Sequence, residues 1–289
     1  MDSKKNKTAI IRIHCPDQRG LVARVTDFIH RNNGNIIALD QHTDNEQSYF
    51  FMRLEFEING FGLTQEQISP AFEHAIATPC KMNWSIEFNE DVHRMAIFVS
   101  KSSHCIYDLL ARVQGGEWNV EVPVIVSNHL DLKPIADQFG IPFEYIPITA
   151  DTKAEQEKKT VELLRSYNVN LIVLARYMQV VSDDFIKQFP QQIINIHHSF
   201  LPAFAGGRPY HAAYERGVKI IGATGHYVTA DLDAGPIIEQ DIIRISHHDS
   251  INSLVQKGKD IEKIVLARAV RAHLKRRTLV YQNRTIIFN

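Results

Sequence analysis

The apolar pattern of this 289-residue chain changes at a polar hexapeptide, residues 89–94. Before it, residues 8–15 alternate as a strand does, and Leu21, Val22, Val25, Phe28 and Ile29 follow at helical spacing. Three more strands (35–39, 49–58 and 84–88) and a helix (64–76) complete the order βαββαβ. This is the split βαβ pattern of a small ferredoxin-like sheet covered on one face.

Beyond the hexapeptide, continuous apolar strands alternate with helices. The strands are expected at residues 95–100, 122–127, 143–146, 171–175 and 193–196. Apolar runs of this kind indicate a doubly wound, mostly parallel sheet that is buried on both faces. Two hairpin-like strands, 222–229 and 236–245, extend the sheet, and a helix over 250–275 packs on it. The sequence therefore predicts an α/β protein with an N-terminal domain over 1–88, a linker over 89–94 and a second domain over 95–289.

Charge and cysteine content exclude several classes of function. The 32 basic and 33 acidic side chains leave a net charge of −1, whereas nucleic-acid binders usually carry a strongly basic face. No stretch approaches the ~18 apolar residues that span a bilayer, and the N-terminus does not resemble a secretory signal. The three cysteines are far apart, as is typical of reduced thiols. We expect a cytoplasmic protein that binds neither nucleic acid nor membrane.

A polar cluster follows the apolar strand that begins at Ile193. Asn195 and His197 are two residues apart, so both side chains leave the same face of the strand. Open α/β sheets bind ligands at this carboxyl edge. An amide beside an imidazole can stabilise a carbonyl oxygen as it gains negative charge, while the imidazole exchanges protons.

A second polar segment, Thr229-Ala230-Asp231-Leu232-Asp233-Ala234-Gly235-Pro236, forms a turn between two expected strands. A carboxylate close to His197 would fix the tautomer of its ring and favour the imidazolium form. Asp231 and Asp233 could equally form an Asx turn before Gly235, and the spacing leaves both readings open.

Together the two segments resemble the formyltransferases that use formyltetrahydrofolate. The matching motifs are Asn195-x-His197-x-Ser199-x-Leu201-Pro202 and Asp231-x-Asp233-x-Gly235-Pro236. The resemblance implies that Asn195, His197 and Asp233 form the catalytic set. It also implies folate-binding residues, namely Arg176, Tyr177, Met178, Gln179, Val180, Ser199 and Gly235. For Met178, Val180 and Val181, core packing at a helix start is the alternative interpretation.

One departure from that family concerns the acceptor. Glycinamide ribonucleotide formyltransferases cradle a phosphate on a Gly-rich loop after the first strand, whereas residues 99–105 here contain no glycine. We therefore expect water as the acceptor. We expect neither a metal nor a cofactor, because the pairs His197-His198 and His247-His248 lack zinc-ligand spacing.

The N-terminal segments 16–22 and 34–36 resemble an ACT domain, a module that often binds amino-acid effectors. The resemblance implies an effector such as methionine or glycine at Asp17, Arg19, Gly20, Gly34 and Asn35, although a helix cap alone would explain 17–20. A small sheet of this kind leaves an edge to pair, so a homo-oligomer is expected.

An ACT domain joined to a formyltransferase-like domain resembles the formyltetrahydrofolate deformylase family. That resemblance implies hydrolysis of 10-formyltetrahydrofolate to formate and tetrahydrofolate, with the formate entering one-carbon metabolism and purine biosynthesis. The alternatives are transfer of the formyl group to an unidentified amine and a metabolite sensor without catalysis.

Overall fold

A computed structural model describes residues 7–203 and 209–289 and divides the chain into two compact units. The first comprises residues 1–92 with the C-terminal segment 286–289, and the second comprises 93–285. The second unit begins at β5 (His93–Val99), two residues before the boundary expected from the sequence. Among the described residues, no helix is long and apolar enough to cross a membrane.

The first unit is an antiparallel sheet in the order β2-β3-β1-β4. Its strands are β1 (Thr8–Pro16), β2 (Asn35–Asp44), β3 (Tyr49–Glu57) and β4 (Asn83–Phe88). Helix α1 (Leu21–Arg31) buries Leu21, Val25, Phe28 and Ile29 against it. The second helical region is α2 (Gln65–Phe72), a π-helical segment (Glu73–Ala77) and α3 (Thr78–Cys80). The βαββαβ order is as expected, and the helix predicted over 64–76 extends to Cys80.

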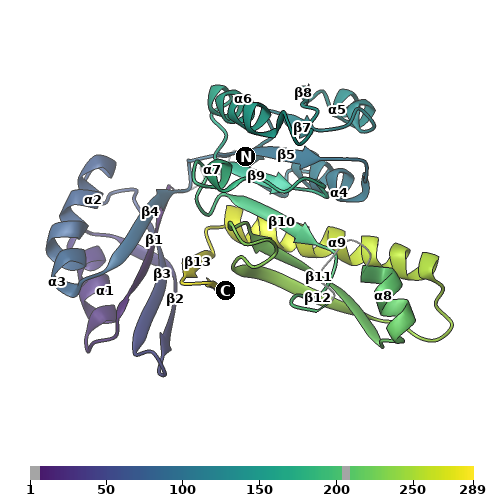
Figure 1. Ribbon diagram of the computed structural model, residues 1–289. Helices are drawn as coiled ribbons and strands as arrows, with labels where there is room; N and C mark the ends of the chain where they lie inside the picture. The colour runs from purple at the N-terminus through teal and green to yellow at the C-terminus, as the bar shows by residue number, and fades with distance from the viewer. Residues whose placement is uncertain (1–6, 204–208) are drawn as a thin grey trace. The chain divides into compact units, whose positions relative to one another are not determined.

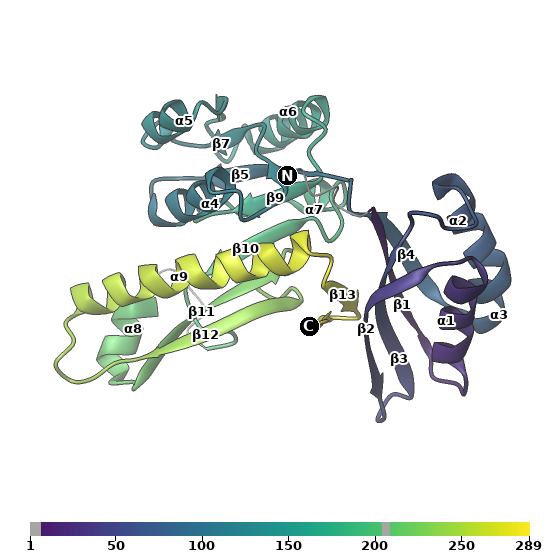
Figure 2. The ribbon, with the colours of Figure 1, turned by 180° about the vertical axis from the view of Figure 1, so that it is seen from behind.

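The second unit contains an eight-stranded sheet, which Figures 1 and 2 show from opposite sides. The order is β12-β11-β10-β9-β5-β7-β8, and the short β6 also pairs with β5. These strands are β6 (Val120–Glu121), β7 (Ile125–Ser127), β8 (Phe143–Tyr145), β9 (Leu171–Leu174), β10 (Ile193–His197), β11 (Ile220–Tyr227) and β12 (Ile237–Arg244). The pairs from β10 to β8 are parallel, and β11 and β12 add an antiparallel hairpin.

Helices cover both faces of this sheet. On one face, α4 (His104–Gln114), α5 (Lys133–Phe139) and α9 (Ile251–Leu274) pack on side chains such as Met95, Ile97 and Val99. On the other, α6 (Lys153–Ser166) and α7 (Asp183–Ile186) pack on Ala96 and Phe98. Figure 2 shows α9 running along β10–β12. Burial on both faces explains why these strands are apolar without alternation.

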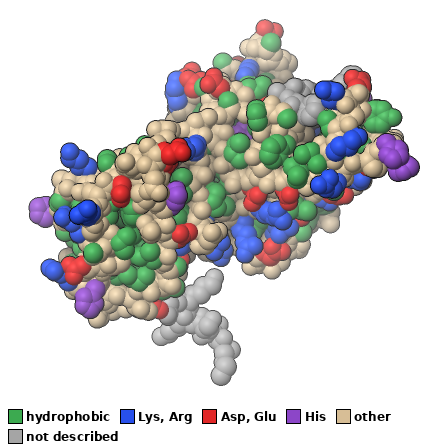
Figure 3. Space-filling view, turned by 90° about the horizontal axis from the view of Figure 1, so that it is seen from below, with side chains coloured by type: hydrophobic (Ala, Val, Ile, Leu, Met, Phe, Trp, Pro, Cys, Tyr) green, Lys and Arg blue, Asp and Glu red, His purple; other side chains and the backbone are tan. Residues whose placement is uncertain are grey.

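The sequence missed several short elements. These are α7, α8 (Pro209–Arg216) and the terminal hairpin of β13 (Thr278–Tyr281) and β14 (Arg284–Ile287). The strand expected over 122–127 is the shorter β7, and the two-residue β6 lies before that range. On the face drawn in Figure 3, acidic and basic side chains lie beside one another.

The strand order reverses between β5 and β9. From β5 the chain proceeds to β7 and β8 on one side, and it returns to β9 and β10 on the other. At such a switch point the connections after neighbouring strands turn away from each other and leave a crevice at the carboxyl ends. The polar segments after β5, β9 and β10 therefore meet at one edge of the sheet.

Candidate active site

A cavity of about 360 Å³ opens at the carboxyl ends of β9 and β10. Its walls come from the segment after β9, from β10, from the end of β11 and from the turn before β12. Of the candidate residues, those that line the cavity are Asn195, His197, Asp233, Arg176, Tyr177, Met178, Gln179 and Val180. Segments more than 30 positions apart in the sequence thus meet here.

Strand β10 holds Asn195 and His197 on one wall of the cavity. Asn195 lies opposite His226 of β11, and its amide Nδ2 is 3.2 Å from His226 Nε2. His197 is 6% exposed, and the described residues supply no hydrogen-bond partner for its Nε2. A buried nitrogen without a protein partner is costly, which favours a partner supplied by a ligand.

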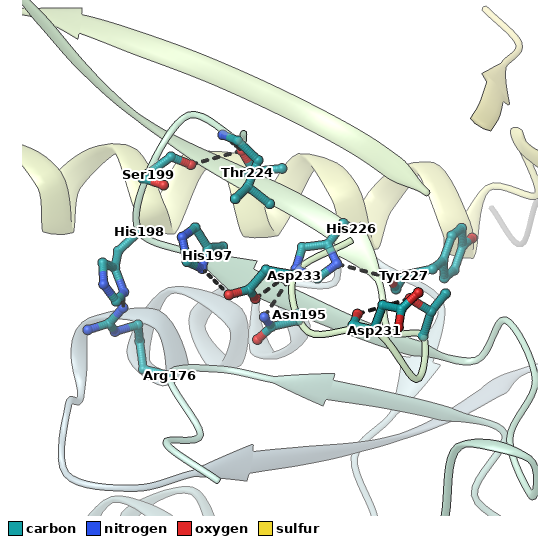
Figure 4. A network of polar contacts seen from close by, with 12 residues as sticks. Arg176, Asn195, His197, His198, Ser199, Thr224, His226, Tyr227, Asp231 and Asp233 are labelled. Atoms are coloured by element: carbon teal, nitrogen blue, oxygen red, sulfur yellow. Dashed lines mark hydrogen bonds and ion pairs between the residues drawn. The ribbon is translucent and has the colours of Figure 1, made fainter. Parts of the chain in front are cut away.

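Asp233 lies between two histidine rings. Its Oδ2 is 3.1 Å from His197 Nδ1, and its Oδ1 is 3.6 Å from His226 Nε2. The hydrogen bond from His197, followed by the contact with His226, holds the pKa of the Asp233 carboxyl well below its usual range. Figure 4 shows Asp233 pointing toward both rings. The carboxylate is therefore ionised and fixes the orientation of His197.

Gly235 sets the path of the turn that carries Asp233. A Cβ atom at this position would lie 1.8 Å from the backbone oxygen of Tyr227, so only glycine allows this approach. The Tyr227 amide donates to Pro236 O at 2.9 Å and anchors the same turn. Gly235 does not line the cavity, so in this structure it shapes the turn and does not form part of the cavity wall.

The segment after β9 carries five of the candidate folate-binding residues. The Met178 amide donates to Ser100 Oγ at 2.9 Å, and Ser100 Oγ donates to Asn128 Oδ1 at 2.7 Å. Ser100 thereby ties the segment to the ends of β5 and β7. Met178 and Val180 are 57% and 55% exposed, so the core-packing alternative is wrong for these two residues. Val181 is partly buried and packs against the core cluster that contains Phe98, as that alternative predicts.

Ser199 lies outside the cavity lining. Its hydroxyl donates to Ala203 O at 2.7 Å, and its own carbonyl accepts from Thr224 Oγ1 at 2.9 Å. Both contacts hold the loop after β10, and Figure 4 shows the one with Thr224.

Sequence reasoning missed His226 and His198, which do line the cavity. The available signal for His226 was its place two residues after Thr224 on an expected strand, which puts both side chains on one face of that strand.

The candidate effector residues of the first unit do not all lie together. Gly34 and Asn35 line an open hollow between α1 and β2, whereas Asp17, Arg19 and Gly20 are exposed in the turn before α1. Gly20 directly precedes α1, and its φ of 86° lies in the left-handed region that favours glycine. Residues 17–20 therefore belong to a turn, and of these candidates only Gly34 and Asn35 line the hollow.

One group of side chains has the composition of a metal site. His104, Cys105 and Glu262 place ligand atoms within 4.8 Å of one another. However, Arg176 Nε lies 3.4 Å from the Glu262 carboxylate, and burial raises the pKa of the Cys105 thiol well above its usual value. A neutral thiol beside a guanidinium is a poor cation site.

Comparison with known families identifies both units. Residues 93–270 match the formyl transferase family model, and residues 9–71 match the ACT domain model. The formyltetrahydrofolate deformylase of Synechocystis sp. is 52% identical over 98% of this chain and 99% of its own length. This chain belongs to the formyltetrahydrofolate deformylase family.

Further relatives agree with that assignment. The Bacillus subtilis formyltetrahydrofolate deformylase is 47% identical over 100% of this chain and 96% of its own length. The crystal structure of the Pseudomonas syringae deformylase superposes with a TM-score of 0.96 at 41% identity, covering 100% of this chain and 96% of that one. Glycinamide ribonucleotide transformylase 1 from Symbiobacterium toebii matches 70% of this chain and 97% of its own, with a TM-score of 0.65 at 28% identity. The expected fold class and family resemblance are confirmed.

Proposed function

We propose that this protein hydrolyses 10-formyltetrahydrofolate to formate and tetrahydrofolate at the cavity beside β10. The proposal rests on the contacts of the His197 ring. Asp233 binds its Nδ1 at 3.1 Å, while its buried Nε2 has no partner among the described residues. A ring held at one nitrogen and open at the other is suited to exchange a proton with a bound molecule.

The proposed reaction adds water to an amide. A water oxygen attacks the formyl carbon, and the carbonyl oxygen becomes an oxyanion that Asn195 Nδ2 and His197 Nε2–H stabilise. Asp233 stabilises the imidazolium and orients the water. His197 Nε2, which takes one proton from the attacking water, passes that proton to the folate N10. The C–N bond then breaks with its electron pair leaving on nitrogen, and the released formic acid ionises to formate.

The cavity walls suit a large aromatic substrate. Met178, Val180 and Leu232 are among its lining residues, and each is more than half exposed. Exposed apolar side chains around a cavity that holds a few polar groups are typical of a ligand site. We propose that the pterin and its linked ring cover them, while backbone groups of residues 176–180 supply polar contacts.

Water as the acceptor distinguishes this proposal from formyl transfer. The loop after β5 contains no glycine, and His104 at the start of α4 is bound to Glu262 at 2.7 Å. A phosphate cradle at this helix start would need small residues that leave the backbone amides open. We propose that no phosphorylated amine binds there and that no metal or cofactor takes part.

We further propose a cytoplasmic homo-oligomer whose first unit binds an amino-acid effector, methionine or glycine. The thiols of Cys15, Cys80 and Cys105 are all free, as in a reducing compartment. The edge strand β2 exposes Ile37 and Leu39, which offers an apolar edge for pairing. The formate released by the proposed hydrolysis would enter one-carbon metabolism and purine biosynthesis.

A formate assay on the purified protein tests the activity directly. With 10-formyltetrahydrofolate and no added amine, formate and tetrahydrofolate should appear in equal amounts. Turnover that requires an amine, with the formyl group found on that amine, would instead establish a transferase. No turnover under either condition would favour a sensor.

A further inference from the structure

Helix α9 carries a buried acid that the proposed hydrolysis does not use. Glu262 is 1% exposed and does not line the cavity. Tyr210 OH donates to its Oε1 at 2.5 Å, and His104 Nε2 lies 2.7 Å from its Oε2. Although burial would raise the Glu262 pKa, the contacts with His104, Arg176 and Tyr210 together lower it. An ionised carboxylate this deeply buried requires polar partners, because its desolvation is expensive.

Arg176 connects this acid to the cavity. Its Nε lies 3.4 Å from Glu262 Oε2, and its Nη1 hydrogen-bonds His198 Nδ1. Arg176 has a φ of 63°, a left-handed conformation that is uncommon outside glycine. The backbone is therefore held in a strained form, and from it the guanidinium reaches both Glu262 and His198. Figure 4 shows the contact between Arg176 and His198.

The arginine contact fixes the protonation of His198. A guanidinium has only donors, so His198 Nδ1 must accept and carry no proton. The neutral ring then has its proton on Nε2. His198 stacks on His197 with a centroid separation of 5.1 Å and an interplanar angle of 13°. A neutral ring at this distance leaves the neighbouring His197 free to become an imidazolium, whereas a charged one would oppose it.

The groups that face this pair come from several elements. His197 contacts Asp233 of the turn before β12, and Asp233 also contacts His226 of β11. His198 faces Arg176 and the ring of Tyr210 of α8, 6.1 Å away. Glu262 is surrounded by Arg176, Tyr210 and, from α4, His104 and Cys105. In this set Glu262 balances the charge of Arg176, and Asp233 balances the charge that develops on His197.

We propose that Glu262 is a positioning residue, which holds Arg176 against His198 and so keeps His198 in its neutral Nε2–H form beside His197. The effect on rate rests on the proposed function, while the effect on the histidine tautomer does not. Glu262 itself touches no substrate. It acts on the reaction through Arg176 and His198.

The test is Glu262→Gln, which removes the charge and nearly preserves the volume. The kcat for formate release should fall about tenfold, the size of a coupling within one hydrogen-bond network, while KM changes less than about twofold. Asp241→Asn is the matched control, since it removes the 2.9 Å ion pair of Arg268 on α9 away from the cavity. It should retain wild-type kcat. An unchanged kcat in Glu262→Gln, or a change in KM alone, would overturn the proposal.

A second measurement keeps the proposal testable if activity is lost for another reason. Nitrogen-15 NMR of the wild-type protein should show His198 with an unprotonated Nδ1 and a protonated Nε2, and Glu262→Gln should lose that pure tautomer. Arg176→Met should lose it too, and the double variant should lose no more kcat than Arg176→Met alone. Additive losses, or a His198 signal unaffected by Glu262→Gln, would refute the link. Wild-type protein that shows the tautomer but releases no formate would refute only the proposed function.

Discussion

The two compact units bury apolar side chains alike but differ in the polar side chains they bury. In the described part of the first unit, the buried polar residues Thr8 of β1 and Arg53 of β3 both bond to Glu55 of β3. In the second, His197, His198, His226 and Glu262 are buried in or beside one cavity. Burial of polar groups is costly, so such a concentration marks the place where chemistry requires it.

The largest expected effect follows from breaking the Asp233 contact with His197. In Asp233→Asn the negative charge that stabilises the imidazolium is lost, so kcat should fall by about 10²–10⁴. A formate assay with circular dichroism as a fold check measures this. Asp231→Asn, two residues away in the same turn and exposed, is the control and should remain close to wild type. Equal losses in both variants would mean that the turn, rather than the carboxylate, is what matters.

A somewhat smaller loss is expected at Asn195. Asn195→Ala removes one proposed oxyanion donor, which typically costs ~10²–10³ in kcat. The loss should appear in kcat with little change in KM, because the contact strengthens only when charge develops on the oxygen. Steady-state kinetics with 10-formyltetrahydrofolate separates the two constants. A rise in KM at constant kcat would instead assign Asn195 to substrate binding.

A third effect concerns stability rather than chemistry. Gly235→Ala places a methyl group 1.8 Å from Tyr227 O, and the turn must shift at a cost of about 1–3 kcal/mol. Thermal unfolding should show a lower Tm, and activity should fall because Asp233 moves with the turn. Gly140→Ala is the control, since its φ of 66° is strained but nothing lies within 4 Å of the added atom. Should the two variants lose the same stability and both retain activity, the close approach at Gly235 would not matter.

Local pattern predicted the elements, and motif resemblance predicted the cavity residues. Asn195 and His197 share a strand face because of a two-residue period, which any strand imposes. Their meeting with Asp233, 36 positions later (233 − 197), depends on the turn before β12 and could be predicted only by resemblance. Resemblance also grouped Ser199 and Gly235 with the binding residues, although their contacts hold a loop and a turn.

The network around Glu262 could not be predicted from sequence. Its members come from α4, the segment after β9, α8 and α9, and their spacing in the chain follows no period. Position 262 lies on the apolar face of an amphipathic helix, where a single glutamate does not by itself indicate a functional site. Only the packing of α9 on the sheet brings it to His104 and Arg176.

The last expected effect is on stability alone, and it tests whether the first unit has a binding role comparable to the second. A ligand that binds only the folded protein stabilises it by about 2.7 kcal/mol at 100 times its Kd, so methionine or glycine should raise Tm by a few degrees. Asn35 lines the hollow, with its amide bonded to Glu57 at 3.0 Å, and Asn35→Ala should abolish the shift. Asn83→Ala, on the exposed surface of β4, should leave it intact. If neither amino acid changes Tm, or if the shift survives in Asn35→Ala, the hollow is not an effector site. The first unit would then differ from the second in having no ligand there, and its role would be assembly.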